Sequence, residues 1–178
     1  MKVVLIGFRA TGKTSVGKAL AKRLGLAFYD LDRLIEERAG RSISEIVAEE
    51  GWPAFRRLER EMMFEAASWP AGVIALGGGA VMHEDEMKLL KQNACVVWLK
   101  APPEIIARRL ATDEKTLTQR PSLTGAGVLE EIETLLTKRE PLYHRFADLE
   151  LDSHQEDPET LAERISKLLK RCLCGRGE

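Results

Sequence analysis

The segment GFRATGKTS, residues 7–15, combines two glycines, a lysine and three hydroxyl side chains directly after an apolar run. The spacing Gly-x-x-x-x-Gly-Lys-Thr is typical of a phosphate-binding loop, in which glycines let successive backbone N–H groups point into one concavity. In such a loop, the Lys13 side chain reaches the outer phosphates of a nucleotide and the Thr14 hydroxyl is a ligand for Mg²⁺. The segment therefore predicts a site for nucleotide phosphates, with an ordinary strand-to-helix turn as the alternative.

The residues on both sides of this loop favour the phosphate-binding interpretation. The run at 3–6 is typical of a strand. After the loop, Val16, Leu20 and Leu24 recur at the spacing of one helix face, and Gly25 is the expected end of that helix. A strand, a glycine-rich turn and a helix in this order are the context in which phosphate-binding loops occur.

Apolar runs that are typical of strands alternate along the chain with helical patterns. This alternation predicts an α/β fold in three layers, with a five-stranded parallel sheet between layers of helices. Most of the runs are almost continuously apolar, as expected for strands that are buried on both faces. The expected strands are 3–6, 26–29, 72–76, 94–99 and 148–151, and the expected later helices are 105–110, 128–136 and 158–173.

Two segments do not fit this layered core. Residues 31–70 contain only helical patterns, which predicts a helical insertion between the second and third strands. Residues 111–127 are polar and unpatterned, with two glycines and a proline. Such a stretch inside a compact domain indicates a mobile lid, and a surface loop without function is the alternative.

The composition limits the possible partners. A chain of 178 residues, 44% hydrophobic and 31% charged, is expected to form one globular domain over residues 1–178. Its net charge of −1 provides no field for gripping nucleic acid. No apolar run approaches the roughly 20 residues that cross a membrane, and three cysteines form no disulfide framework. We therefore expect a cytoplasmic monomer with no nucleic-acid or membrane partner.

Among the first four expected strands, only the second is directly followed by carboxylates. Ligands of an open parallel sheet bind at the carboxyl ends of its strands. Asp30 and Asp32 follow the second strand, whereas the third and fourth strands are followed by no carboxylate. These two aspartates are therefore the groups best placed to serve Mg²⁺ and a second substrate. As an alternative, Asp32 only caps a helix that begins at Arg33, and the two roles are compatible.

Glycines and arginines elsewhere have both a functional and a structural interpretation. Gly77–Gly79 follow the third strand, which indicates close approach of a ligand to the backbone. Arg56 is either a binding residue or the partner of Glu59 in a surface ion pair on one helix face. Arg139 is either a binding residue or a solvated helix residue. Arg120, in the expected lid, is placed to swing over the phosphates as charge develops.

The ordered set GFRATGKTS, DLD, FRRLE, LGGGAV, QRP and KREPLY closely resembles the shikimate kinase family over essentially the whole chain. The motifs after the phosphate loop are unspecific one by one, and their order and combination carry the resemblance. It implies a P-loop kinase fold like that of nucleoside monophosphate kinases, with a helical substrate-binding region and a mobile lid. It also implies transfer of the γ-phosphoryl group of ATP to the 3-hydroxyl of shikimate, with Mg²⁺.

On the nucleotide side, the resemblance implies that Lys13 holds the phosphates and that Thr14 binds the magnesium ion. Asp30 serves the metal shell through water, and Arg120 contacts ATP from the lid. The loop residues implied in ATP binding are Ala10, Thr11, Gly12, Lys13, Thr14 and Ser15.

On the acceptor side, the resemblance implies that Asp32 binds the shikimate hydroxyl that attacks. Arg56 and Arg139 grip the shikimate carboxylate, a task that suits the planar guanidinium group. Gly78 lends its backbone to the substrate. Lys13, Asp32 and Arg120 are the implied catalytic residues.

Two features depart from the family pattern. Ala10 occupies a loop position where the family often has glycine, so the backbone there must suit a Cβ atom. The stretch LATDEKTLT before Arg120 is longer than usual, which leaves open whether Arg108 or Arg109 stacks on adenine.

Two other functions stay open from the sequence. A gluconate kinase of the same fold is compatible with the paired arginines, although DLD together with three glycines favours shikimate. A nucleotide-dependent switch domain is the second alternative. The chain has no Asn-Lys-x-Asp motif for guanine and no carboxylate after the third or fourth strand to position a hydrolytic magnesium ion, which argues against a switch.

Overall fold

The computed structural model describes residues 1–112 and 127–174. The expected lid at 111–127 lies almost entirely outside these ranges, and so does Arg120. In chain order the described elements are β1 (Lys2–Ile6), α1 (Lys13–Leu24), β2 (Phe28–Asp30), α2 (Leu31–Ala39), α3 (Ile43–Glu50), α4 (Trp52–Ala67), β3 (Gly72–Ala75), the 3₁₀ helix η1 (Ala80–Met82), α5 (Glu84–Gln92), β4 (Cys95–Lys100), α6 (Pro103–Thr112), α8 (Val128–Phe146), β5 (Leu149–Asp152) and α9 (Pro158–Cys174).

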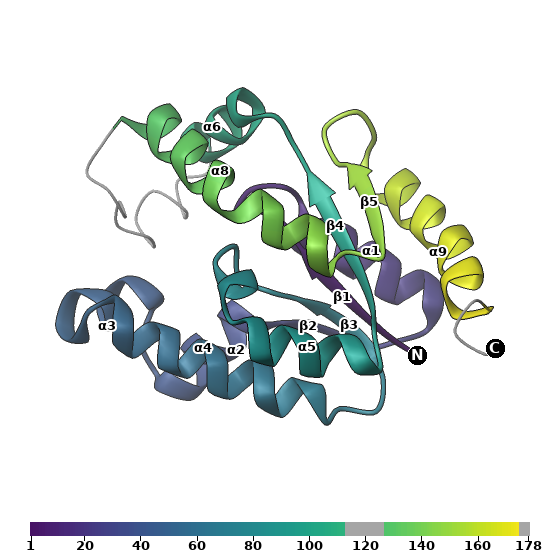
Figure 1. Cartoon of the computed structure of the whole chain (residues 1–178), viewed down its shortest axis with the longest axis horizontal. Helices are drawn as coiled ribbons and strands as arrows, with labels where there is room; N and C mark the ends of the chain where they lie inside the picture. The colour runs from purple at the N-terminus through teal and green to yellow at the C-terminus, as the bar shows by residue number, and fades with distance from the viewer. Residues whose placement is uncertain (113–126, 175–178) are drawn as a thin grey trace.

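The five strands form one parallel sheet in the order β2-β3-β1-β4-β5, which confirms the predicted α/β fold (Figure 1). The central strand β1 pairs with β3 and β4, so that Val4 lies opposite both Ile74 and Val96. β2 and β5 are the edge strands. Because every strand runs in the same direction, the loop after β1 and the end of β2 meet at one edge of the sheet.

The side chains of β1 alternate between two hydrophobic cores, as the pleat of a strand requires. Val3 and Leu5 pack in the core beneath α1 and α9. Val4 and Ile6 face the opposite core, which is formed with α2, α3, α4, α5 and α8. Figure 1 shows these two groups of helices on opposite faces of the sheet. Burial on both faces explains why the sequence of this strand is continuously apolar.

A third hydrophobic cluster fixes the phosphate-binding loop to two helices. Phe8, in the loop, packs with Ile106 and Leu110 of α6 and with Ile132 and Leu136 of α8. Phe8 is only 1% exposed. The loop is therefore anchored on its own apolar side chain.

The ends of the helices differ in how well the sequence predicts them. α1 ends at Gly25, as expected, and this glycine has φ +64°. α8 continues beyond the helical pattern at 128–136 to Phe146 and includes Pro141. It continues because Tyr143 and Phe146 extend its apolar face into the core, where both are buried.

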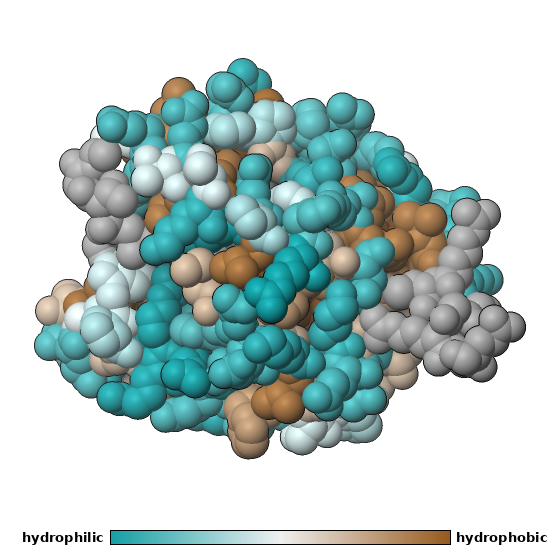
Figure 2. Space-filling model, viewed as in Figure 1, coloured by the Kyte–Doolittle hydropathy of each residue, from teal (hydrophilic) through white to brown (hydrophobic). Residues whose placement is uncertain are grey.

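The surface shows no long apolar feature on the face drawn in Figure 2. Hydrophilic side chains dominate that face, and hydrophobic residues gather only in small patches. Within residues 1–112 and 127–174, no helix combines the length and apolar character needed to span a membrane.

Candidate active site

The phosphate-binding loop joins β1 to α1, and two of its glycines have conformations that other residues disfavour. Gly7 has φ +142°, and a Cβ atom there would lie 2.4 Å from the carbonyl oxygen of Leu99. Gly12 has φ +91°. Lys13 Nζ donates to the carbonyl oxygens of Gly7 and Phe8 at 2.8 and 2.7 Å. The lysine thus lies along the loop that it is predicted to serve.

Ala10 adopts φ +60°, and it is the one non-glycine residue with a positive φ among those that the structure describes. The left-handed region costs an L-residue about 1 kcal/mol. The carbonyl oxygen of Ala10 accepts from Arg109 Nη1 at 3.0 Å, and Arg109 Nη2 donates to the carbonyl oxygen of Ser153 at 3.0 Å. The loop accommodates the Cβ atom through this strained backbone, which Arg109 ties to α6.

Thr14 and Asp30 connect the first turn of α1 to the end of β2. Thr14 Oγ1 donates to Asp30 Oδ2 at 2.8 Å. Asp30 Oδ1 accepts from the backbone N–H of Arg33 at 3.4 Å and caps α2, which begins at Leu31. The alternative in which Asp32 is the cap is therefore wrong. The cap is Asp30, and Asp32 lies in the first turn of α2.

Two of the three glycines after β3, Gly77 and Gly79, make room for side chains of the site itself. A Cβ atom at Gly77 would lie 2.6 Å from Asp32 Oδ1 and 2.7 Å from Glu59 Oε1. A Cβ atom at Gly79 would lie 2.5 Å from Arg56 Nη1. The sequence predicts that a ligand approaches the backbone of these glycines. Part of that space is instead occupied by side chains of the protein, namely Asp32, Glu59 and Arg56.

Arg56 and Glu59 form the expected pair on one face of α4, with 2.6 Å between Nη1 and Oε2. It is not a surface pair, because the Glu59 side chain is only 1% exposed. The guanidinium carbon of Arg56 also lies 5.3 Å from the ring centres of Trp52 and Phe55. One edge of the guanidinium is therefore fixed by Glu59 while its face is supported by two aromatic rings.

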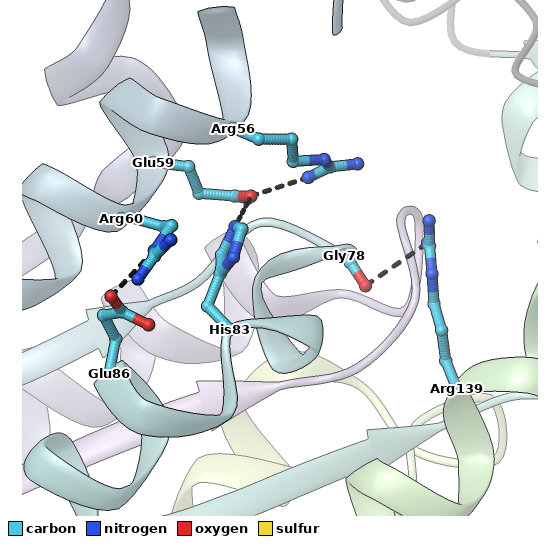
Figure 3. Close-up of polar contacts among 7 residues, drawn as sticks. All are labelled: Arg56, Glu59, Arg60, Gly78, His83, Glu86 and Arg139. Carbon is cyan, nitrogen blue, oxygen red and sulfur yellow. Dashed lines mark hydrogen bonds and ion pairs between the residues drawn. The ribbon is translucent and has the colours of Figure 1, made fainter. Parts of the chain in front are cut away.

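Arg139 is 7% exposed, so the interpretation as a solvated helix residue is wrong. Its Nη1 donates to the carbonyl oxygen of Gly78 at 3.3 Å, and the same oxygen accepts from the Tyr143 hydroxyl at 2.5 Å. Burial lowers the pKa of Arg139 and raises the pKa of Tyr143 from their ordinary values. Tyr143 is therefore a neutral donor. Figure 3 shows Arg56 and Arg139 converging on the Gly78 segment from α4 and α8.

Two hollows lie side by side at this edge of the sheet. A cavity of about 730 Å³ covers the phosphate loop and reaches Asp32. A smaller hollow of about 20 Å³ is lined by Arg9, Arg56 and Arg139. Arg9 and Gly78 line both. A group held by the arginines would therefore lie next to a nucleotide bound by the loop.

The lining of the large cavity differs for Arg108 and Arg109, the two arginines that the sequence leaves as candidates for stacking on adenine. Arg109 lines it, together with Ser153 and Pro158 near the start of α9. Arg108 is exposed on α6 and is not among the lining residues. Arg120 lies outside the described residues, so its distance from the cavity is not part of this geometry.

Three residues at the site were not predicted from the sequence. Arg9 lies inside the loop motif, but nothing in the motif indicates which way its side chain points. Tyr143 follows Arg139 by four residues, so helical spacing could have placed both on one face. His83 contacts Glu59 at 2.8 Å from a different element, and no spacing rule connects them.

Comparison with known proteins gives a consistent result. A family model described as shikimate kinase matches residues 9–170 of the chain. Shikimate kinase 2 of Yersinia enterocolitica is 41% identical over 167 residues, which is 94% of this chain and 94% of that protein. The shikimate kinase of Thermodesulfovibrio yellowstonii is 42% identical over 174 residues, which is 98% of both chains.

Solved structures agree. The shikimate kinase of Acinetobacter baumannii in complex with shikimate has a TM-score of 0.88 and 33% identity, and the match covers 99% of this chain and 95% of that one. The shikimate kinase of Bacteroides thetaiotaomicron has a TM-score of 0.83 and 33% identity over 96% of this chain and 98% of that one.

Proposed function

The chain belongs to the shikimate kinase family and catalyses ATP-dependent phosphorylation of shikimate, and we propose that the two hollows at the strand ends are the site of this reaction. The observation that carries the proposal is the shared wall of these hollows. Arg56 and Arg139, from separate helices, line a recess that has Gly78 in common with the cavity over the phosphate loop. A small anionic acceptor would thus lie beside the phosphoryl donor.

In this proposal Arg56 and Arg139 bind the shikimate carboxylate. Their guanidinium groups are planar and can each donate two parallel hydrogen bonds to a carboxylate. Arg9, which lines the same recess and pairs with Glu131 at 3.2 Å, is a third cation for this anion. Such local cations let a chain of net charge −1 bind an acid.

Asp32 is proposed to bind the 3-hydroxyl of shikimate, orient it and accept its proton as the phosphoryl group transfers. Its carboxylate lines the large cavity and is not used as a helix cap. Glu59 Oε1 lies close to Gly77, as Asp32 Oδ1 does, and it is buried without a hydrogen-bond partner among the described residues. A polyol such as shikimate offers hydroxyl donors for an acceptor of this kind. The helices between residues 31 and 70 would then form the substrate-binding region.

Lys13 and the backbone of the loop are proposed to hold the ATP phosphates, through the residues from Ala10 to Ser15. Thr14 Oγ1 and Asp30 Oδ2 are adjacent oxygens at the cavity wall, a donor set that fits Mg²⁺. When bound there, with Asp30 acting through water, Mg²⁺ neutralises charge on the phosphate oxygens. Arg109 is proposed to contact the adenine and Arg120, from the lid, the phosphates.

Two further properties are proposed. We expect the enzyme to act as a monomer, because both hollows are built from one chain. We expect it to work in the cytoplasm, where ATP is available and where cysteines such as the buried Cys95 stay reduced.

The function is tested by measuring ADP release with ATP and Mg²⁺ in the presence of shikimate, of gluconate or of neither. We expect release that depends on shikimate and yields shikimate 3-phosphate. Equal release with gluconate would favour the sugar-acid kinase alternative. Release that is independent of any acceptor would favour a hydrolytic switch.

A further inference from the structure

Glu59 is the centre of a buried network that links α4 to His83, the residue between η1 and α5. Its Oε2 accepts from Arg56 Nη1 at 2.6 Å and lies 2.8 Å from His83 Nε2 (Figure 3). Because the ion-paired Glu59 is a carboxylate, its oxygen can only accept, so His83 Nε2 carries the hydrogen. A single oxygen thus takes one donor from α4 and one from the segment that follows η1.

The backbone of His83 is fixed at the junction of two helices. Its N–H donates to the carbonyl oxygen of Ala80 at 3.0 Å, and its own carbonyl accepts from the N–H of Met87 at 2.9 Å. The side chain is 11% exposed. Because its backbone is held by these two hydrogen bonds, the His83 ring keeps a fixed direction for its hydrogen bond to Glu59. A positioning residue requires such a fixed direction.

Arg56 is the member of this network that faces the proposed substrate. A substrate carboxylate competes with Glu59 for the guanidinium hydrogens, because both are anions that bind the same group. If Arg56 were the sole donor to Oε2, binding of substrate would loosen a carboxylate that is 1% exposed, at a cost in desolvation. A second donor keeps Glu59 in place while Arg56 is shared.

We propose that His83 is a positioning residue for substrate recognition, which holds the Glu59 carboxylate and thereby keeps Arg56 aligned toward the substrate carboxylate. The proposal rests on the proposed function, in which Arg56 binds shikimate. It predicts an effect on the affinity for shikimate and none on the affinity for ATP, because Arg56 and Glu59 line the smaller hollow and are not among the residues that line the cavity over the phosphate loop.

The chain offers a matched control on the same two helices. Arg60 Nε donates to Glu86 Oε1 at 2.8 Å, which also links α4 to α5 but includes neither Glu59 nor Arg56 (Figure 3). Arg60→Gln therefore removes a bridge between the same helices without altering the network. Any effect that comes only from weaker packing of α4 on α5 should appear in this variant too.

The test compares His83→Met with His83→Gln in steady-state assays and in shikimate titrations by calorimetry. The two new side chains have similar length and shape, and only glutamine carries an N–H donor that can reach Glu59. For His83→Met we expect the KM and Kd for shikimate to rise about tenfold, the effect of one hydrogen bond to a charged group. The KM for ATP should stay within about twofold. His83→Gln should recover most of the loss, and Arg60→Gln should behave like wild type.

Three outcomes would overturn the inference. The first is an unchanged affinity for shikimate in His83→Met. The second is an equal rise in the KM for shikimate and for ATP, which would indicate a general disturbance of the fold. The third is an equal loss of shikimate affinity in His83→Gln and His83→Met, which would assign the effect to packing of the ring. If His83→Met does not fold, the comparison of His83→Gln with Arg60→Gln still tests the inference. A folded His83→Gln protein that binds shikimate more than about tenfold more weakly would show that an N–H donor at this position does not restore binding. A wild-type protein that binds no shikimate would instead refute the proposed function.

Discussion

The hydroxyl of Tyr143 donates a 2.5 Å hydrogen bond to the carbonyl oxygen of Gly78, although 65 residues separate them in the sequence. Tyr143 is 1% exposed and its ring stacks on Trp98, with 5.5 Å between ring centres. The bond joins α8 to the loop after β3. The Gly78 carbonyl oxygen also accepts from Arg139. The Tyr143 hydrogen bond therefore helps to position Arg139, which is proposed to bind the substrate.

Tyr143→Phe removes this hydroxyl and keeps the ring. We expect the free energy of unfolding to fall by about 1 kcal/mol, because the Gly78 carbonyl keeps only the Arg139 donor. The Kd for shikimate should rise, since the Arg139 guanidinium loses a neighbour that fixes its acceptor. Urea unfolding and calorimetric titration measure the two effects. Tyr29→Phe is the matched control, because Tyr29 is only partly buried and packs against Trp69. Wild-type stability and affinity in Tyr143→Phe would show that the hydrogen bond is dispensable.

Ala10→Gly tests the strained backbone of the phosphate loop. Alanine at φ +60° costs about 1 kcal/mol, whereas glycine adopts this conformation freely but loses more entropy on folding. These effects nearly cancel, so we expect stability within about 0.5 kcal/mol of wild type. Turnover should be retained, because the loop keeps its conformation and the Arg109 bond to the residue 10 carbonyl. A loss of turnover beyond about tenfold would mean that the Cβ atom itself shapes the ATP site.

The cap of α9 gives a prediction for pH. Hydrogen bonds from the hydroxyl and the backbone N–H of Thr160 hold the pKa of Asp157 below its ordinary value. A lowered carboxylate pKa stabilises the fold above the unfolded pKa of about 3.9, and this contribution is lost as pH falls through the folded value. Wild type should therefore be more stable than Asp157→Asn at pH 7, and the difference should shrink below about pH 4. Urea midpoints between pH 7 and pH 3 measure this, and a constant difference would contradict it.

The sequence predicts the strands well because β1, β3 and β4 lie in the middle of the sheet. Burial on both faces leaves their sequences almost continuously apolar, which needs no knowledge of the partners. The helical pattern at 128–136 covers only the first part of α8, for the opposite reason. Pro141 is a local signal for a break, and the burial of Tyr143 in the core outweighs it.

The site divides in the same way. A single short motif contains the residues proposed to bind the phosphates and Mg²⁺, so spacing alone is enough to propose Lys13 and Thr14. The arginine recess is assembled from α4, α8 and the loop, and only packing brings Arg9 to Arg139. His83 meets Glu59 across 24 residues and two elements, which no periodicity connects.

The cap of α2 decides how Asp32 is to be tested. Because Asp30 accepts from the N–H of Arg33, an amide at position 32 removes no capping bond. Asp30→Asn is the companion variant, since asparagine caps a helix about as well as aspartate. It should leave the helix intact and raise the KM for MgATP, because an amide replaces the carboxylate beside Thr14.

Asp32→Asn then isolates the chemistry of the carboxylate. The amide presents a similar oxygen to the attacking hydroxyl, but it has no negative charge and very little basicity. General-base assistance contributes about 10²–10⁴-fold, and phosphoryl transfer, which relies mainly on positioning, belongs at the lower end of that range. We therefore expect turnover to fall about a hundredfold or more while ATP binding and the unfolding midpoint are retained. Steady-state kinetics with shikimate, ATP titration and thermal unfolding provide these three readouts. Turnover within a few-fold of wild type would mean that the carboxylate only lines the cavity and takes no part in the transfer.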